Sequence, residues 1–379
     1  MKGVKILIAL NTAWNLANFR TGLITALQHE GYDVVAAAPP DEHALRVPCR
    51  FIDLPMDAGG TKILKDAALF LRYVRLLRRE RPNVFLGYTI KPNVYGSFAA
   101  HLLGIPVINN VAGLGAVFIK GGWLARFVRG LYRLALSRSA HIFFQNPDDL
   151  TLFIEQQLVD RSRTSLLPGS GVDTSRFVPS TPPVMDEDTP FRFLLVARLL
   201  RDKGVVEYVD AARALRAQHG AKVECGVLGF ADVRNPTAIA RDELESWVAE
   251  GVINYLGEAD DVRPHLARAH CIVLPSYREG TPRSLLEAAA MAKPIVTTDA
   301  PGCREVVTDG INGYLCRVQD ADDLRKKMQR VIDLDAEALS TMGAESRRIA
   351  VERFDERLVI AQYSQRISVA IATHSVRGK

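Results

Sequence analysis

Two glutamates stand eight positions apart in the stretch "SYREGTPRSLLEAAAMAKPIVTTD", which runs from Ser276 to Asp299. Glu279 follows a short apolar run typical of a buried strand, and Glu287 lies within an apolar pattern of helical spacing. Two carboxylates can act as acid and nucleophile on a glycosidic bond, can hold the hydroxyl groups of a ligand, or can be exposed charges without a role. The spacing alone is compatible with all three.

The residues between the two glutamates predict a helix N-terminus. Thr281 is suited to the N-cap and Pro282 to the first helical position. At about 1.5 Å per residue, Glu287 would lie about 9 Å along the helix axis. Backbone N–H groups around Gly280 to Arg283 would attract phosphate, because the start of a helix carries unpaired donors and a positive partial charge. We therefore expect the two carboxylates to reach different parts of one elongated ligand.

A pair of cations opens the second half of the chain, in "LLVARLLRDKG". Arg198 ends a predicted buried strand, and Lys203 follows five residues later, just before the next helix. Such a pair could hold a diphosphate, with the arginine as a planar fork and the lysine as a point charge. The alternative is two surface cations at a strand end.

Polar residues also follow the predicted strands of the first half. They lie in "NTAWNLANFRTG", "YTIKPNVYGS" and "NNVAGLG", where a ligand could approach the backbone, although turn residues without a role would look the same. The candidates are Asn18 and Arg20, Lys91 and Asn93, and Asn110, Gly113 and Gly115.

Buried apolar strands alternate with helical patterns along the whole chain, which predicts parallel sheets covered on both faces. A stretch with four prolines and no periodicity, 174–190, interrupts the series and suggests a linker. We expect two doubly wound α/β domains, 1–175 and 190–355, that face a central cleft. Two charged amphipathic helices should close the chain, and the last, about 356–379, is expected to pack back on the first domain.

The net charge of +5 is unevenly distributed, because residues 1–180 carry 21 Lys/Arg against 13 Asp/Glu, whereas the remainder carry 27 against 30. The basic first half should face an anionic partner. Two basic segments, about 62–81 and 120–138, fit a membrane surface: in the second, Arg126, Arg129 and Arg133 share one helical face. Ordinary helices that cover a sheet are the alternative.

Other features narrow the location and chemistry. The five scattered cysteines point to a reducing cytosol, and no apolar run reaches membrane-spanning length. We find no P-loop, GxSxG, HExxH or GxGxxG motif, so nucleotide hydrolysis, serine hydrolysis, zinc proteolysis and ordinary dinucleotide binding lose support. No nucleic-acid motif is present either.

Together these motifs resemble the retaining GT-B glycosyltransferases, specifically glycosyltransferase family 4. The resemblance rests on the EX7E motif "EGTPRSLLE", on "ARLLRDKG", on "LPGSGVD" and on "PGCREVVTDGINGYL", and it covers nearly the whole chain. The segment "YTIKPNVYGSFAAHLLGIPVINNVAGLG" looks like bacterial enzymes that extend glycans on undecaprenyl diphosphate, as in lipopolysaccharide or O-antigen biosynthesis.

The resemblance implies a role for each motif residue. Arg198 and Lys203 would bind the diphosphate of a UDP-sugar and stabilise the leaving group, so that no metal or other cofactor is expected. Glu287 would accept hydrogen bonds from the ribose, and Glu279 would position the transferred sugar. The catalytic set is then Glu279, Arg198 and Lys203, and the further residues expected to bind the sugar donor are Gly280, Thr281, Pro282, Arg283 and Glu287.

The first domain would bind the acceptor, a polyprenyl-diphosphate-linked saccharide, at the cytoplasmic face of the membrane. Its expected contacts with the acceptor are Asn18, Arg20, Lys91, Asn110 and Gly113. Many relatives have a histidine in the cleft after the fifth strand, but "VINNVAGLG" has none, so an asparagine or the glycine loop would replace it. We expect the sugar to be an N-acetylhexosamine, and the resemblance implies that it is transferred with retention through front-face attack.

Three alternatives stay open on the sequence. A glycosyltransferase could use a soluble acceptor. A glycosidase could use Glu279 and Glu287 directly, but the cation pair would then have no purpose. A binding module for anionic surfaces could use the basic half alone, and its affinity would fall steeply with salt.

Overall fold

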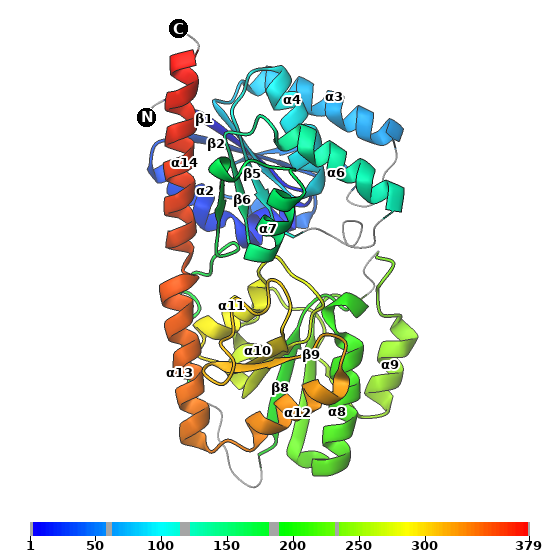
Figure 1. Ribbon diagram of the computed structural model, residues 1–379. Helices are drawn as coiled ribbons and strands as arrows, with labels where there is room; N and C mark the ends of the chain where they lie inside the picture. Colours follow the sequence, from blue (N-terminus) through cyan, green and yellow to red (C-terminus); the bar gives the residue numbers. More distant parts are fainter. Residues whose placement is uncertain (1–2, 58–62, 114–121, 182–188, 232–234, 378–379) are drawn as a thin grey trace. The chain divides into compact units, whose positions relative to one another are not determined.

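The computed structural model describes residues 3–57, 63–113, 122–181, 189–231 and 235–377 (Figure 1). It divides into two compact units, Met1–Ser170 with Glu356–Lys379 and Gly171–Asp355. Each unit contains one parallel sheet with helices on both faces, which confirms the predicted pair of doubly wound α/β domains. No described helix is long and apolar enough to cross a membrane.

The first unit is built on a seven-stranded parallel sheet with the order β3-β2-β1-β4-β5-β6-β7. Its strands β4 and β5 are buried along their whole length, and β2 is buried except for Asp33, as expected for a parallel sheet covered on both faces. The strands are β1 Lys5–Ala9, β2 Asp33–Ala38, β3 Arg50–Asp53, β4 Val84–Tyr88, β5 Val107–Val111, β6 His141–Phe144 and β7 Thr164–Leu166.

Two groups of helices cover this sheet. On one face, α2 and the C-terminal helix α14 contribute to a shared core with β1, β2 and β4. On the other face, α3 and α4 pack on the sheet, and α6 and α7 form a core with β5 and β6. The helical elements are α1 Ala13–Phe19, α2 Thr21–His29, η1 Glu42–Arg46, α3 Ile63–Glu80, η2 Pro92–Gly96, α4 Ser97–Leu102, α6 Gly122–Leu136, α7 Pro147–Glu155, η3 Arg161–Arg163 and α14 Glu356–Arg377.

The second unit is built on a six-stranded parallel sheet with the order β10-β9-β8-β11-β12-β13. The strands are β8 Phe191–Val196, β9 Val223–Leu228, β10 Asn254–Tyr255, β11 Cys271–Leu274, β12 Ile295–Thr298 and β13 Gly313–Cys316. The helical elements are η4 Arg201–Lys203, α8 Val205–His219, η5 Gly220–Lys222, α9 Arg241–Ala249, α10 Arg263–Arg268, α11 Arg283–Ala290, α12 Ala321–Ile332 and α13 Ala336–Arg353.

The described part of the expected linker belongs to the second unit. The Val172 N–H donates to the carbonyl of Phe354 at 2.8 Å, and Phe177 is buried in the core beneath α11 and α13. Burial of this phenylalanine fixes a segment whose prolines suggest an extended connection. Residues 182–188, which include the acidic "DED", lie outside the described part of the chain.

The chain ends in three helices, α12, α13 and α14, so the expectation of two is wrong. Asp335 caps the start of α13 by accepting from the Ala338 N–H at 2.8 Å, and the C-cap residue of α13, Phe354, is buried. The side chains of α14 that pack on the first sheet include Val359, Tyr363 and Ile367. Capping and burial at two short breaks therefore divide into three helices a region whose sequence pattern predicts two.

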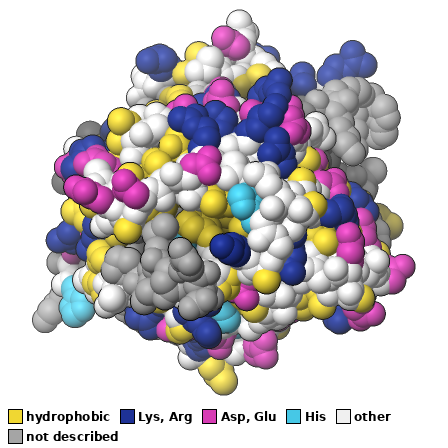
Figure 2. All heavy atoms as spheres, turned by 90° about the horizontal axis from the view of Figure 1, so that it is seen from below, with side chains coloured by type: hydrophobic (Ala, Val, Ile, Leu, Met, Phe, Trp, Pro, Cys, Tyr) yellow, Lys and Arg dark blue, Asp and Glu magenta, His cyan; other side chains and the backbone are white. Residues whose placement is uncertain are grey.

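Charged residues of both signs are mixed on the surface. On the face shown in Figure 2, Lys and Arg side chains lie among Asp and Glu side chains. The second unit contains many such pairs, among them Arg213–Glu250, Lys326–Asp322 and Arg348–Glu352. Pairs of this exposed kind each contribute little to stability.

Candidate active site

Three loops meet at the carboxyl edge of the second sheet, where parallel α/β sheets bind ligands. They follow β8, β11 and β12. The Tyr277 N–H donates to the Asp202 carbonyl and the Glu279 N–H donates to the Pro301 carbonyl, each at 2.9 Å. The Ser276 hydroxyl also donates to the Asp202 carbonyl, at 3.1 Å. These bonds fix the three loops against one another.

Lys203 and Glu279 are brought together at this edge. The Lys203 Nζ donates a hydrogen bond to the Glu279 Oε1, and their side chains are only 17% and 15% exposed. The same oxygen accepts from the Ser276 hydroxyl at 2.9 Å. The structure thus places the first glutamate of the EX7E motif against the lysine of the Arg/Lys pair.

Two glycines make this close approach possible. Gly204 has a φ of +72°, and a Cβ there would lie 2.1 Å from the Pro275 carbonyl oxygen. Gly302 has a φ of +85°, and a Cβ would lie 2.4 Å from the carbonyl oxygen of Glu279 and 2.5 Å from that of Gly280. No other residue type fits without moving the backbone that carries Lys203 or Glu279.

Helix α11 begins one residue later than expected. Pro282 is the N-cap, with an extended ψ of 117°, and Arg283 is the first helical residue. No side chain caps this end, so the prediction of Thr281 as N-cap and Pro282 as first helical residue is wrong. The fixed φ of proline, −71° here, suits either position, and the sequence therefore cannot separate them. The N-terminus still follows Glu279–Thr281 directly, as a phosphate site requires.

Glu287 pairs with Arg283 one turn earlier on α11. The Arg283 Nε donates to the Glu287 Oε1 at 2.9 Å, and its Nη1 donates to the Gly171 carbonyl at 2.8 Å. Burial raises the pKa of the Glu287 carboxyl, and the Arg283 guanidinium partly opposes this shift. Glu287 is thus a mostly buried carboxylate held in one orientation, which suits an acceptor of ligand hydroxyl groups.

Arg198 belongs to the loop that follows β8, at the same edge of the sheet. Its side chain is exposed after the end of β8, and within the described residues no ion pair holds it. Of the two cations of the Arg/Lys motif, Lys203 is held by an ion pair with Glu279, whereas Arg198 has no ion pair among the described residues.

The two candidate cations of the first unit, Lys91 and Arg20, have different kinds of partner. The Lys91 Nζ forms an ion pair with Asp66 Oδ1 of α3 at 2.8 Å, and both side chains are largely buried. Arg20 is also buried, at 5% exposure, but its guanidinium lies over the Tyr88 ring, 4.3 Å from the centroid. Lys91 thus stabilises the packing of α3, whereas Arg20 meets an aromatic face.

The remaining first-unit candidates have mainly structural partners. The Asn18 Nδ2 donates to the Trp14 carbonyl within the same turn, at 2.9 Å. Asn110 is completely buried at the end of β5, where its Nδ2 donates to the Tyr363 hydroxyl at 2.9 Å and its Oδ1 accepts from Gln145 at 3.0 Å. Gly113 has a φ of +120°, and residue 115 lies outside the described part of the chain.

Several residues of these networks have no signal in the sequence. Ser276 stands inside the motif but is not marked by the EX7E spacing. Asp66 and Tyr363 lie far along the chain from Lys91 and Asn110, and Tyr88, although it begins the quoted stretch "YTIKPNVYGS", lies far along the chain from Arg20. Only the folded structure brings each of them to its partner.

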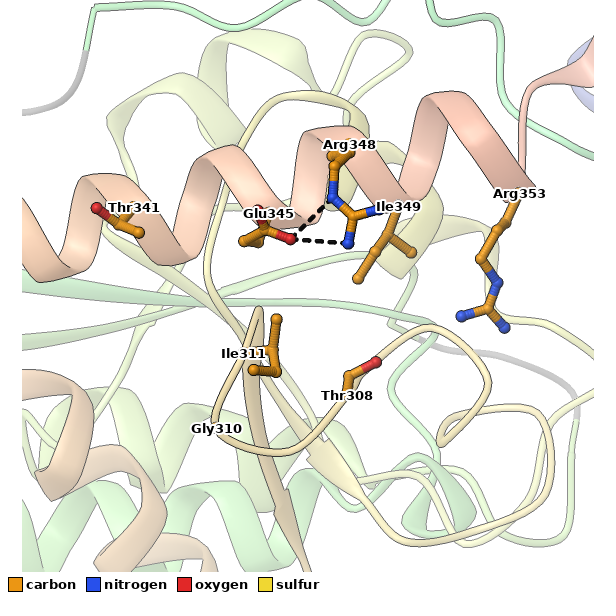
Figure 3. Close-up of a pocket in the computed structure, with 8 residues that line it drawn as sticks. All are labelled: Thr308, Gly310, Ile311, Thr341, Glu345, Arg348, Ile349 and Arg353. Atoms are coloured by element: carbon orange, nitrogen blue, oxygen red, sulfur yellow. Dashed lines mark hydrogen bonds and ion pairs between the residues drawn. The ribbon is translucent and has the colours of Figure 1, made fainter.

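A depression elsewhere in the second unit does not involve any predicted residue. It lies between α13 and the loop before β13 (Figure 3). Of its two arginines, Arg348 is paired with Glu345 at 2.9 Å, and Arg353 donates to the Glu305 carbonyl at 3.3 Å. The lining residues are Thr308, Gly310, Ile311, Thr341, Glu345, Arg348, Ile349 and Arg353.

Family models match both halves of the chain. The model of glycosyl transferases group 1 matches residues 190–333, and the model of the glycosyl transferase 4-like domain matches residues 17–169. The two matches cover the second sheet, every strand of the first sheet except β1, and the three loops at the carboxyl edge of the second sheet. The chain is a glycosyltransferase. Its motif residues Arg198, Lys203, Glu279 and Glu287 all fall within the group 1 match.

Relatives of this glycosyltransferase are known across most of its length. It is 26% identical over 371 residues to the N,N'-diacetylbacillosaminyl-diphospho-undecaprenol alpha-1,3-N-acetylgalactosaminyltransferase of Campylobacter jejuni, covering 92% of this chain and 94% of the relative. It is 23% identical over 311 residues to the UDP-Gal:alpha-D-GlcNAc-diphosphoundecaprenol alpha-1,3-galactosyltransferase of Escherichia coli, covering 80% and 79%.

A solved structure shares the fold of the glycosyltransferase. Anabaena Alr3699/HepE in complex with UDP and glucose superposes with a TM-score of 0.77 at 18% identity, over 97% of this chain and all of the other. This likeness confirms the predicted GT-B class of two Rossmann-like domains. The glycosidase alternative loses its support, because both halves match glycosyltransferase domains.

Proposed function

We propose that this glycosyltransferase moves an N-acetylhexosamine from a UDP-sugar to a saccharide carried on polyprenyl diphosphate, with retention of configuration and without a metal ion. The observation that carries the proposal is the Lys203–Glu279 pair beside the N-terminus of α11. A cation for phosphate and a carboxylate for sugar hydroxyls stand together there, as a sugar nucleotide requires.

The sugar donor would lie along the carboxyl edge of the second sheet. Lys203, Arg198 and the N-terminus of α11 would hold the diphosphate, Glu279 the sugar, and Glu287 the ribose. Ser276 and Arg283 orient the two carboxylates, by hydrogen bonds of 2.9 Å each. The HepE structure, with UDP and glucose bound to the same fold, supports a UDP-sugar as the ligand class.

The reaction would exchange one C–O bond for another on the same face of the sugar. The bond from the anomeric carbon to the UDP β-phosphate oxygen breaks, and a bond from that carbon to the acceptor hydroxyl oxygen forms. The hydroxyl proton passes to the leaving diphosphate, whose growing charge Arg198 and Lys203 stabilise. Neither glutamate acts as a nucleophile, which agrees with the cationic partner that each already has.

The acceptor class is supported by the two relatives. The names of both describe a saccharide on diphospho-undecaprenol, and that of the Campylobacter relative describes transfer of N-acetylgalactosamine. We assign the same classes of acceptor and sugar to this chain, and a role in building a bacterial surface glycan. A soluble acceptor is the alternative outcome of the test below.

Binding to the cytoplasmic face of the membrane would bring the enzyme to a lipid-linked acceptor. On α6, Phe127 and Leu134 are 52% and 64% exposed, and Arg126 and Arg133 beside them are exposed as well. On α3, Leu64 and Leu71 are exposed at 87% and 50%. Exposed apolar and arginine side chains on one helix suit an anionic lipid surface. Lys62 and residues 120–121, also expected there, lie outside the described part of the chain.

The test is a transfer assay with a panel of UDP-sugars and a synthetic lipid-diphosphate-linked saccharide, read by mass spectrometry, with and without EDTA. We expect the mass increment of one N-acetylhexosamine, unchanged by EDTA. Transfer only to a water-soluble saccharide would contradict the proposed acceptor, and loss of transfer in EDTA would contradict the metal-free mechanism.

A further inference from the structure

We infer that Arg20 binds the diphosphate of the lipid-linked acceptor in the first unit. This inference deepens the proposed function and rests on it for the identity of the ligand. It is carried by a buried guanidinium that no carboxylate of the described residues neutralises, at the edge of the sheet where such folds bind ligands.

Arg20 lies between α1 and α2, after the end of β1, and its side chain is 5% exposed. Its Nε is buried and has no hydrogen-bond partner in the part of the chain that the structure describes. Its Nη1 makes one long hydrogen bond, 3.4 Å, to the carbonyl of the neighbouring Phe19. Within the described residues it forms no ion pair. A buried charge without a counter-charge is costly, and folded proteins rarely keep one unless a ligand or partner supplies that charge.

Tyr88 fixes the orientation of the guanidinium. The ring lies at the end of β4, with the Arg20 Cζ 4.3 Å from its centroid, and it packs against Tyr363 of α14 with the ring centroids 5.9 Å apart. A cation over an aromatic face is held in place but keeps its charge. The planar fork of the guanidinium therefore stays available in a fixed direction for an anion.

The position of Arg20 in the sheet also fits a ligand site. Strands β1 and β4 are neighbours, and the chain order reverses between them in the sequence β3-β2-β1-β4-β5. In doubly wound sheets the crevice at this switch point binds ligands. Arg20 follows β1, and its aromatic platform ends β4.

Lys91, the other candidate cation of the first unit, is neutralised by a carboxylate, in contrast to Arg20. Lys91 lies beyond the end of the same strand, β4, yet Asp66 neutralises it at 2.8 Å. Of the two cations that the sequence offers to an acceptor, only Arg20 lacks a carboxylate among the described residues. A diphosphate is the anion that matches it best, because arginine binds phosphate oxygens through two parallel N–H donors.

The test measures binding of two probes to the full chain with saturating UDP, which occupies the diphosphate site of the second unit. Isothermal titration with farnesyl diphosphate and, separately, with inorganic diphosphate distinguishes the lipid-linked source from free diphosphate. We compare wild type with Arg20→Gln, Arg20→Lys and the control Arg138→Gln, which removes an exposed arginine of the same unit.

We expect wild type and Arg138→Gln to bind both probes, farnesyl diphosphate more tightly. Arg20→Gln should lose at least about tenfold in affinity for both, the size of effect usual for a charged hydrogen-bonding partner. Arg20→Lys should fall between them because it keeps the charge but loses the fork. The melting temperature of Arg20→Gln without ligand should be unchanged or raised, since an unpaired buried charge is removed.

Unchanged binding by Arg20→Gln, or no binding of either probe by wild type, would overturn the inference. A lowered melting temperature with unchanged affinity would assign Arg20 to the fold instead. The proposed function is tested separately: if diphosphate binding depends on Arg20 but no sugar is transferred to a lipid-linked acceptor, the site stands and the proposed function fails. Conversely, if sugar is transferred to the lipid-linked acceptor and Arg20→Gln leaves the KM for that acceptor unchanged, the proposed function stands and the inference about Arg20 fails.

Discussion

The ammonium group of Lys203 donates a hydrogen bond to the carboxylate of Glu279, which lies 76 positions later in the chain. This bond connects the two motifs of the second unit, and it leaves the Ser276 hydroxyl as the other partner of the same oxygen. Glu279 therefore keeps an anchor when Lys203 turns toward a phosphate. The charge of Lys203 can serve the ligand without releasing the carboxylate.

Replacing Lys203 should weaken UDP binding more than it weakens the fold. We expect Lys203→Ala to raise the Kd for UDP by about 10- to 100-fold, because charged hydrogen bonds are worth about 1.5–3 kcal/mol. The matched control is Arg201→Ala, two residues away, whose guanidinium pairs with Glu243 at the surface. Calorimetric titration should show near wild-type affinity for the control, and equal Kd values for the two variants would refute the phosphate role of Lys203.

The space around Gly302 predicts a second, purely steric effect. Gly302→Ala would place a methyl group within 2.5 Å of two carbonyl oxygens of the Glu279 loop, whereas Gly310→Ala has a similar φ of +78° with nothing within 4 Å. The control should lose about 1–2 kcal/mol from backbone strain alone. We expect Gly302→Ala to lose a further 1–3 kcal/mol, about the cost of overpacking, and to bind UDP more weakly. Urea unfolding and UDP titration on both variants give the comparison, and equal stability would argue against a tight contact.

The environment of Glu287 predicts that UDP binding weakens as the pH is lowered. Burial raises the pKa of its carboxyl, so on lowering the pH it takes up its proton above the ordinary glutamate value of about 4.3. A protonated Glu287 loses an acceptor for the ribose, and the Kd for UDP should then rise. The Kd of Glu287→Gln should be raised at neutral pH and should not change further across this range. An exposed control, Glu245→Gln, should follow wild type, and a wild-type Kd that stays constant down to pH 4.3 would contradict the assignment.

The C-terminal helix should depend on one buried hydrogen bond. Tyr363→Phe removes the acceptor of the Asn110 Nδ2 and leaves that buried amide with one partner fewer, which should cost about 1–3 kcal/mol. The control Tyr32→Phe removes a hydroxyl whose contact with Ser368, also on α14, is 3.4 Å long. Denaturant unfolding should show a larger loss in the free energy of unfolding for Tyr363→Phe than for Tyr32→Phe. A Tyr363→Phe variant as stable as wild type would show that this hydrogen bond does not hold α14.

Local patterns in the sequence predict those parts of the structure that local forces determine. Short apolar runs in the sequence predict the strands of both sheets. The candidate residues of the second unit lie within two short motifs, so the sequence also predicts that they belong together. Predictions fail where the deciding partner is distant. Nothing near Lys91 marks Asp66 as its counter-charge, and nothing near Arg20 shows that such a partner is lacking.

The boundaries of helices are similarly uncertain from sequence. Proline has the same φ as an N-cap and as a first helical residue, so the N-cap of α11 is Pro282 instead of the expected Thr281, and the helix starts at Arg283. The break between α13 and α14 depends on the burial of Phe354 and on the hydrogen bond of the buried Asp355 with Thr174, which lies far earlier in the chain. Tertiary packing decides both boundaries.

The anomeric configuration of the product tests the central claim most directly. With an α-linked UDP-N-acetylhexosamine and a lipid-diphosphate-linked acceptor, the proton NMR coupling of the new anomeric centre distinguishes retention from inversion. We predict an α-linked product from wild type and its loss in Lys203→Ala. A β-linked product, or release of UDP with free sugar and no transfer, would contradict the account.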